Sequence, residues 1–208
     1  MSPFLRQRLV PLAIAAALAV SAAGCGLFKT QTPESPTGGP GGLSPNFSLP
    51  ESTLATMQRS LHSRNTSDFI LCLADTLLDF REFHATFDPS DITQFAQSGR
   101  TPPDDWITKN EQTFLPQFLV YDTNGFYDLY FTLDTDRGGI TDYGGPTQKK
   151  VYNLHYRVWA VGNSVAVGAA GLTFERIGAN SDYKVTFWED HRDSSGGRTW
   201  GTARLNGR

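Results

Sequence analysis

The chain has 208 residues, a formal net charge of −3 at pH 7, and contents of 39% hydrophobic and 12% aromatic residues. This apolar content is enough to build a packed core, which excludes a globally disordered chain. Neutralising phosphates needs clustered lysines and arginines, and this net-acidic chain has no such cluster, so we expect no nucleic-acid partner.

The N-terminal segment, residues 1–24, has the three parts of a secretory signal peptide. Two arginines precede an apolar run at residues 9–20, and small residues follow. The run is shorter than the roughly 18 residues that a membrane-spanning helix needs. Cys25 comes directly after Ala-Ala-Gly, which resembles the lipobox of bacterial lipoproteins. The resemblance implies cleavage before Cys25, acylation of its thiol, and an exported protein that is lipid-anchored to the cell envelope. A secreted protein without lipid is the alternative.

Residues 25–49 predict a flexible linker between this anchor and a folded domain at residues 50–208. The linker is dense in proline, glycine, serine and threonine, so it cannot bury enough surface to offset the entropy of ordering. If the sulfur of Cys25 carries lipid, the second cysteine of the chain has no disulfide partner. That cysteine, Cys72, lies in an apolar run, and we expect it to be a buried free thiol.

The first part of the domain predicts two helices. Ser48 precedes Glu51 by three residues, which is the spacing of a capping box, and Pro50 suits a first helical turn. Apolar residues then recur at helical spacing at Leu54, Met57 and Leu61. A second helix is expected to begin at Asn65, with Asp68 three residues on. Its apolar stripe is Phe69, Leu73 and Leu77.

A short strand and two further helices complete the N-terminal half. Phe83, Ala85 and Phe87 alternate with polar residues, which is the period of a strand. A short helix follows with Ile92, Phe95 and Ala96 on one face, and Gly99 ends it. The stretch at residues 101–114 predicts a third main helix with acidic residues in its first turn and an end near Pro116.

The C-terminal half predicts strands. Alternating apolar and polar residues, separated by turn sequences, place them at residues 127–133, 152–160, 165–177 and 183–190, with a last strand within 194–205. Residues 136–148 predict a long loop. Helices followed by an antiparallel meander indicate an α+β fold, in which a curved antiparallel sheet wraps around the N-terminal helices.

The stretches "RNTSDFILCLAD", "FDPSD", "DDW", "YKVTFWEDHRD" and "RTWG", in this order, resemble the nuclear transport factor 2-like superfamily. That group includes the SnoaL-like polyketide cyclases, scytalone dehydratase and ketosteroid isomerase. The resemblance covers about residues 50–208. It implies a cystatin-like cone, in which a bent sheet wraps around helices and leaves a pocket at its open end. Enzymes and non-enzymes share this cone, so the fold does not choose between them.

The resemblance also implies where a site would lie, because the family's enzymes use an aspartate or histidine base inside the cone. His84, His155 and Arg157 fall on the polar phase of their strands and are expected to face solvent. Asp75 is expected at a helix end or turn, and the sequence leaves open which of Glu189 and Asp190 faces inward. The residues predicted to wall a pocket for a small apolar ligand are Trp106, Tyr127, Tyr156 and Trp188. The alternative for each is an ordinary place in the core.

These observations favour a non-catalytic binding module that holds a small apolar ligand or an envelope component in the cone. We expect no metal, because adjacent positions in "EDHRD" point to opposite faces of a strand. We also expect no catalytic residue and no cofactor, because the predicted inward faces lack a clear base next to a polarising donor. Two alternatives remain. The first is an enzyme of the isomerase, cyclase or dehydratase type. The second is a docking domain whose open sheet face binds another protein, with a homodimer as one case.

Overall fold

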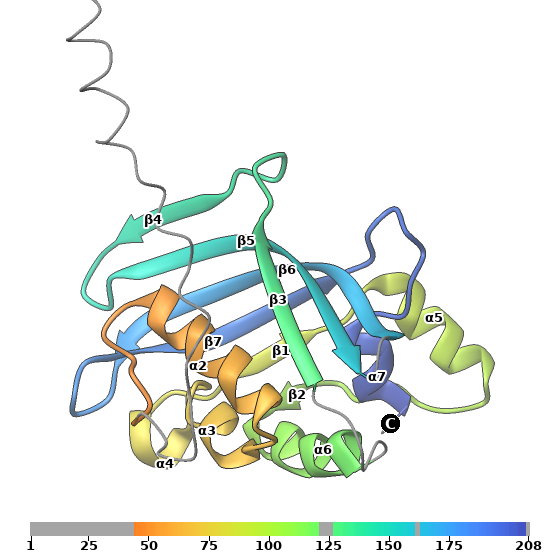
Figure 1. Ribbon diagram of the computed structural model, residues 1–208, viewed down its shortest axis with the longest axis horizontal. Helices are drawn as coiled ribbons and strands as arrows, with labels where there is room; N and C mark the ends of the chain where they lie inside the picture. Colours follow the sequence, from red (N-terminus) through yellow and green to blue (C-terminus); the bar gives the residue numbers. More distant parts are fainter. Residues whose placement is uncertain (1–43, 121–126, 161–162, 207–208) are drawn as a thin grey trace, which may run out of the picture. The chain divides into compact units, whose positions relative to one another are not determined.

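The computed structural model describes residues 44–120, 127–160 and 163–206 (Figure 1). The expected signal peptide at residues 1–24, the lipidation site Cys25 and most of the expected linker lie outside the described residues. Among the helices that the structure describes, none is both long enough and apolar enough to cross a membrane.

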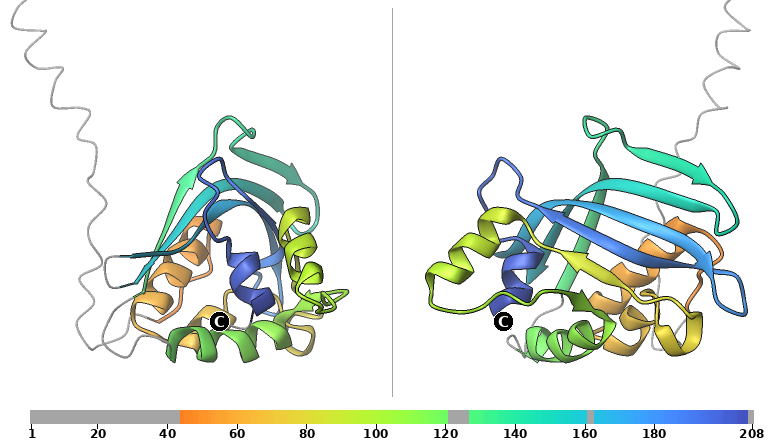
Figure 2. Two further views of the ribbon diagram at one scale, coloured as in Figure 1. Left: turned by 90° about the vertical axis from the view of Figure 1, so that its right-hand side faces the viewer. Right: turned by 180° about the vertical axis from the view of Figure 1, so that it is seen from behind.

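The described residues form a curved sheet of seven strands with helices on its concave side (Figures 1 and 2). The strands are β1 (His84–Thr86), β2 (Trp106–Ile107), β3 (Tyr127–Leu133), β4 (Ile140–Gly144), β5 (Lys149–Ala160), β6 (Asn163–Ile177) and β7 (Asp182–His191). Their order is β2-β1-β7-β6-β5-β3, and β4 also pairs with β5. The fold is therefore α+β as expected, with one departure: β1 and β7 pair in parallel.

The helices are α2 (Pro50–His62), α3 (Thr66–Ile70), α4 (Thr76–Asp79), α5 (Pro89–Gln97), α6 (Thr108–Val120) and α7 (Trp200–Asn206). Helices α2, α3, α6 and α7 lie on the concave side of the sheet (Figure 2). Their apolar side chains and those of the concave face form one core. In this core Leu54, Met57 and Leu61 of α2 are buried, as their helical spacing predicts.

The predicted strand phases are confirmed where the sheet is longest. In β5 the side chains of Tyr152, Leu154, Tyr156, Val158 and Ala160 are buried in the core, and the residues between them are not. Tyr156 lies opposite Gly168 of β6. The register shift between β5 and β6 falls at Val158 and Trp159, beyond Tyr156, so His155 and Arg157 stay on the outer face.

The start of α2 differs from the predicted capping box. Leu49 is the N-cap, and no side chain caps it. The backbone N–H of Ser48 instead donates to Oδ1 of Asn46 at 3.0 Å, which places Ser48 in a turn before the helix. The cap of the next helix is as expected, because Oδ1 of Asn65 accepts from the backbone N–H of Asp68 at 3.1 Å.

The predicted second helix is split into two. Helix α3 ends at Ile70, and Leu73 forms an isolated bridge with β7. Oδ1 of Asp75 then accepts from the backbone N–H groups of Leu77 and Leu78, at 2.8 and 3.3 Å, and starts α4. Because Asp75 opens a new helix, Leu77 leaves the apolar stripe in which it was predicted and is 86% exposed.

The third main helix begins later and ends later than predicted. Residues 101–105 are not helical, β2 follows, and α6 starts at Thr108, whose N–H donates to Oε1 of Glu82 at 3.1 Å. Pro116 lies inside the helix instead of ending it. A proline removes one helical hydrogen bond, but Leu115 and Phe118 beside it are buried in the core, and this packing outweighs the loss.

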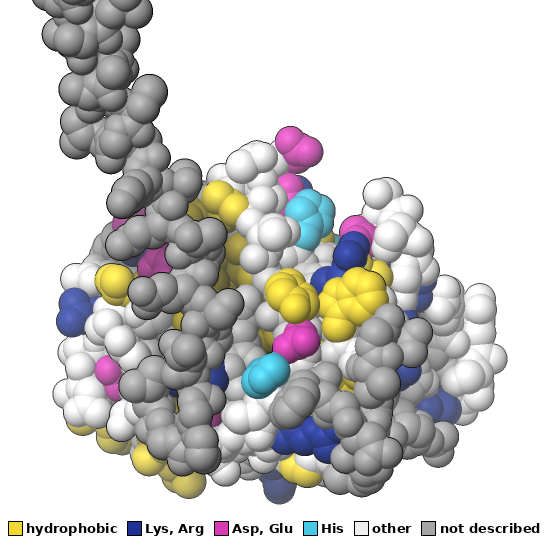
Figure 3. Space-filling view, viewed as in Figure 1, with side chains coloured by type: hydrophobic (Ala, Val, Ile, Leu, Met, Phe, Trp, Pro, Cys, Tyr) yellow, Lys and Arg dark blue, Asp and Glu magenta, His cyan; other side chains and the backbone are white. Residues whose placement is uncertain are grey.

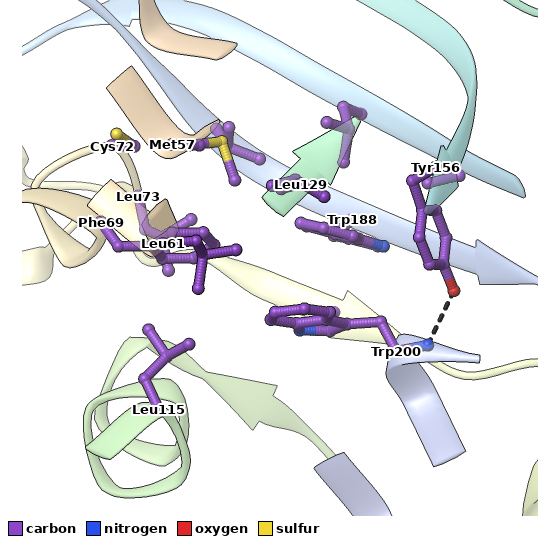
Figure 4. Close-up of a cluster of buried hydrophobic side chains, with 14 of the residues drawn as sticks. Met57, Leu61, Phe69, Cys72, Leu73, Leu115, Leu129, Tyr156, Trp188 and Trp200 are labelled. Carbon is purple, nitrogen blue, oxygen red and sulfur yellow. Dashed lines mark hydrogen bonds between the residues drawn. The ribbon is translucent and has the colours of Figure 1, made fainter. Parts of the chain in front are cut away.

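Two further expectations for the C-terminal half are wrong. The expected loop at residues 136–148 contains β4, which pairs with β5. The expected last strand is the helix α7. Its local cause is Thr199, whose Oγ1 accepts from the backbone N–H of Thr202 at 2.8 Å in the manner of an N-cap. This helix places Trp200 under the concave face of the sheet (Figure 4).

Candidate functional site

Trp200 of α7 lies at the centre of the aromatic core of the cone (Figure 4). It is fully buried and stacks on Trp188 of β7, with ring centroids 6.1 Å apart and planes 19° apart. Its ring centroid is 5.1 Å from that of Phe118 and 6.3 Å from that of Phe69. The space under the sheet is therefore filled by a side chain from the end of the chain.

The predicted ligand-binding residues are all buried and surround Trp200. The exposed fractions are 8% for Trp106, 3% for Tyr127, 2% for Tyr156 and 0% for Trp188. Two of them contact Trp200 directly, since Trp188 stacks on it and the hydroxyl of Tyr156 accepts from its backbone N–H at 2.7 Å. The others reach it through one intermediate: Tyr127 contacts Phe118, and the indole of Trp106 shares the Glu111 carboxylate with that of Trp200.

The cone also contains a buried acid that the sequence did not assign to a face. Asp190 is 1% exposed, and its Oδ1 accepts from the hydroxyl of Tyr156 at 2.6 Å. Its other oxygen accepts from the backbone N–H of Gly201. Burial raises the pKa of the Asp190 carboxyl to about 6, although the hydrogen bonds and the guanidinium of Arg204 oppose that shift. Burial and the nearby Asp190 raise the pKa of Tyr156 well above its ordinary value.

A second buried acid, Glu111 of α6, holds α7 from the other side. Its carboxylate binds the guanidinium of Arg204 at 2.9 and 3.2 Å, and both side chains are 0% exposed. The same carboxylate accepts from the indole N–H of Trp106 at 2.6 Å and from that of Trp200 at 3.2 Å. The carboxylate oxygens of Glu111 are satisfied by these hydrogen bonds, whereas Nη1 of Arg204 is buried without a hydrogen-bond partner, so breaking the pair would leave a poorly compensated buried charge.

The polar groups inside the cone therefore face one another and α7. Asp190 and Tyr156 form an acid pair of the type that could polarise a substrate, but their partners are the backbone N–H groups at the start of α7. In the folded chain these hydrogen bonds hold α7 inside the cone.

The sequence patterns did not indicate Glu111, Trp200 or Arg204, and they left open whether Asp190 faces inward. One signal was available, because Asp190 follows Trp188 by two positions in the same strand and so shares its inward phase.

The other polar candidates lie apart from the cone interior. Nδ1 of His84 pairs with Asp105 at 2.9 Å, and Nε2 of His155 pairs with Asp134 at 3.3 Å, both at partly exposed positions. Glu189 is exposed, and Asp75 caps α4. Within the described parts of the chain, no group of three or more His, Cys, Asp or Glu side chains is placed to hold a metal ion.

A hollow of about 470 Å³, called here the α3–α4 hollow, lies outside this filled core. Elements α3, α4, α6 and β7 contribute to its lining, together with the turn after α3. The lining residues are Thr66, Ser67, Ile70, Leu71, Leu73, Asp75, Leu78, Asp79, Gln112 and Lys184. Neither this hollow nor the polar one described below is lined by any of the four predicted ligand-binding residues.

Large apolar side chains stand exposed beside the hollow. Leu77 is 86% exposed, Leu78 is 63% exposed, Phe80 is 88% exposed and Leu71 is 38% exposed. Hydrophobic side chains are visible along the lower edge of the molecule, where α4 lies (Figure 3). Phe80 also has a left-handed backbone, with φ of 56°, which is uncommon for a bulky residue. A strained turn that presents apolar side chains to solvent is typical of an interaction site.

A second hollow, of about 380 Å³, lies on the outer face of the sheet and is polar. Its lining includes His155, Ala169 and His191, which are neighbours across β5, β6 and β7. Its carboxylates are engaged by the chain. For example, Asp134 accepts from the backbone N–H of Arg137 at 3.1 Å, and Asp88 accepts from that of Arg192 at 2.9 Å.

No protein-family model matches this sequence, and no curated protein matches it. Solved structures with a similar fold do match. A putative calcium/calmodulin-dependent protein kinase type II association domain from Thiobacillus denitrificans is 8% identical, with a TM-score of 0.46, over 72% of this chain and 99% of that one. ActVI-ORFA from Streptomyces coelicolor is 12% identical, with a TM-score of 0.46, over 69% and 93%. AusH from Aspergillus nidulans is 10% identical, with a TM-score of 0.39, over 74% and 94%.

Proposed function

We propose that this chain is a non-catalytic binding module that holds a small, largely apolar ligand in the α3–α4 hollow. One observation carries the proposal: a hollow with apolar walls opens beside exposed leucine and phenylalanine side chains, whereas the cone interior is filled by Trp200. The class of function is the one that the sequence favoured. Its place is different, because the predicted wall residues surround a side chain of the protein itself.

The size and lining of the hollow support a small ligand. About 470 Å³ lies within the range of roughly 300–1,000 Å³ that small-molecule sites occupy. Ile70, Leu71, Leu73 and Leu78 supply its apolar wall, and Ser67 and Gln112 supply hydrogen-bonding groups. Burying about 200 Å² of apolar ligand surface would contribute about 5 kcal/mol before the ordering cost, which corresponds to a dissociation constant of about 0.2 mM at best.

The carboxylates of the hollow accept hydrogen bonds from backbone N–H groups at α4, which favours binding without turnover. Oδ1 of Asp75 caps α4, and Oδ2 of Asp79 accepts from the backbone N–H of Asp75 at 3.0 Å. A neutral ligand with an apolar body suits this wall better than an anion, because the carboxylates of Asp75 and Asp79 line it.

The proposal is tested with N-phenyl-1-naphthylamine, a neutral fluorescent probe, and the purified full chain. Leu78→Asp should weaken probe binding by about tenfold or more, because it places a charge in the wall of the hollow. Ile140→Asp is the matched control, since Ile140 is 47% exposed on β4 and does not line the hollow. Equal binding by both variants and the unaltered chain, or no binding by any of them, contradicts the proposal.

We propose further that the chain is exported and held at the bacterial cell envelope through lipid on Cys25. The support is the sequence of the N-terminal segment, with Cys25 directly after Ala-Ala-Gly. Cys25→Ala should release the protein from the membrane fraction. Intact-mass analysis that finds an unmodified Cys25 in the mature protein would overturn this.

A further inference from the structure

We propose that the α3–α4 hollow takes apolar aldehydes or ketones, and that Nζ of Lys184 captures them as a reversible imine. This inference rests on the proposed function, because it names the ligand class of the same hollow. It adds a covalent contact to a site that is otherwise apolar.

Lys184 is placed in the wall of the hollow by β7. The residue is only 7% exposed, although lysines are rarely buried, and it lines the hollow together with Leu71 and Asp79. Its Nζ donates to the backbone carbonyl of Leu71 and lies 3.7 Å from the centroid of the Phe47 ring. The amine is therefore held at a fixed point among apolar neighbours instead of extending into solvent.

The surroundings of Lys184 favour the neutral, nucleophilic amine. Burial lowers its pKa below the ordinary value for lysine, and this effect outweighs the opposing influence of Asp79, Asp182 and Cys72. Like these three groups, the ring of Phe47 opposes the lowering of the pKa, because an aromatic face attracts the charged ammonium. Desolvation in an apolar pocket is a known way to activate a lysine for attack on a carbonyl group.

The chemistry needs no partner beyond the ligand. The neutral amine attacks the carbonyl carbon, a C–N bond forms, and a proton moves from nitrogen to oxygen to give a carbinolamine. A second proton transfer to that oxygen releases it as water and leaves the C=N bond. Both protons come from the amine nitrogen and leave with the carbonyl oxygen as water, and solvent carries the two transfers, because the Asp79 carboxylate of the hollow accepts from the backbone N–H of Asp75. The apolar chain of the ligand then lies against Ile70, Leu73 and Leu78.

Other lysines of the chain provide internal references. Lys109 and Lys149 are exposed. Neither lines the α3–α4 hollow. Exposed lysines react with aldehydes in proportion to their small neutral fraction, without help from binding. An apolar aldehyde held beside Lys184 should react there at a higher effective concentration.

The experiment treats the full chain with octanal and sodium cyanoborohydride, which reduces an imine to a stable amine, and locates the label by peptide mass spectrometry. Lys184 should be labelled at least about tenfold faster than Lys149. The preference should fall when propanal replaces octanal, because propanal buries less apolar surface. An excess of N-phenyl-1-naphthylamine should protect Lys184 and leave Lys149 unaffected.

The variant Lys184→Met separates the two proposals. It keeps the apolar volume of the side chain and removes the amine, so probe binding should persist while the preferential labelling disappears. Labelling of wild-type Lys184 at or below the rate of Lys149, with probe binding intact, overturns the inference and leaves the proposed function standing. If the wild-type chain does not bind the probe at the α3–α4 hollow, the proposed function itself is overturned. The labelling pattern of the wild-type chain decides the inference even if Lys184→Met fails to fold.

Discussion

Trp200 and Trp188 stack under the centre of the sheet, and they belong to elements that meet only because the end of the chain folds back as α7. Trp188 is part of β7, whereas Trp200 follows a loop and opens the last helix. The contact makes α7 a part of the core. Helix α7 therefore fills the interior of the cone. Several of the following predictions test the contacts that hold it there.

Trp200→Ala should lower the free energy of unfolding by about 3–5 kcal/mol, because it leaves a large cavity in a fully buried site. Indole should bind that cavity and restore part of the lost melting temperature. Trp159→Ala is the control, since Trp159 lies on the outer face and is only partly buried. Indole should not stabilise it. A Trp200→Ala variant that indole leaves unchanged would mean that the core collapses around the deletion.

Glu111→Ala should cost about 3–5 kcal/mol, because it leaves the buried guanidinium of Arg204 without its carboxylate. The double variant Glu111→Leu with Arg204→Met should be less destabilised than the sum of the two single changes, since no unpaired charge remains. Urea unfolding compares the unaltered chain with Glu111→Leu, Arg204→Met and the double variant. Simple additivity would show that Glu111 and Arg204 do not act as a pair.

Stability should fall as the pH rises from about 4 to about 6, through the contribution of Asp190. Its pKa is about 6 in the folded chain and about 3.9 in an unfolded one, so the folded state binds the extra proton in this interval. Two pKa units correspond to about 3 kcal/mol, which is present below pH 4 and lost above pH 6. Asp190→Asn should remove this dependence. Parallel pH profiles of the two chains would contradict the prediction.

Gly168→Ala should destabilise the protein by about 1–3 kcal/mol. Its Cβ would lie 2.6 Å from the Tyr156 hydroxyl and 2.7 Å from the backbone carbonyl oxygen of His191. Gly171→Ala in the same strand is the matched control, because its closest contact would be an ordinary 3.6 Å. Thermal unfolding of the two variants compares them directly, and equal melting temperatures would show that Tyr156 moves aside without cost.

Cys72 should react with thiol reagents only when the protein unfolds. It is a free, fully buried thiol, as the sequence predicted, and burial raises its pKa, so little thiolate forms. The rate of maleimide labelling with increasing urea should follow the unfolding transition. Rapid labelling without urea would show that α3 opens locally.

The sequence predicted the elements whose apolar period is long and regular. The alternation in β5 identified Tyr156 as inward, and the spacing in α2 identified Met57 and Leu61 as core residues. Such patterns are informative because one face of each element packs against the core over its whole length.

The sequence did not predict the elements that tertiary contacts decide. Trp200 lies in a stretch with no clear period, and it becomes helical because Thr199 caps it and Glu111 binds Arg204. Leu77 has the right spacing for a buried stripe, but the cap at Asp75 interrupts the helix before it. The α3–α4 hollow follows from that interruption, so no local pattern could reveal it.

The parallel pairing of β1 with β7 determines the order in which the protein can fold during its synthesis. His84 lies opposite Phe187, about 100 residues later in the chain, and the backbone of Val185 exchanges two hydrogen bonds with Cys72 and Ala74. Strands β1 and β2 therefore have no sheet to join until β7 has left the ribosome. Nascent chains that end before β7 should be open to proteases and bound by chaperones, and their protection should begin only when the last strand is added.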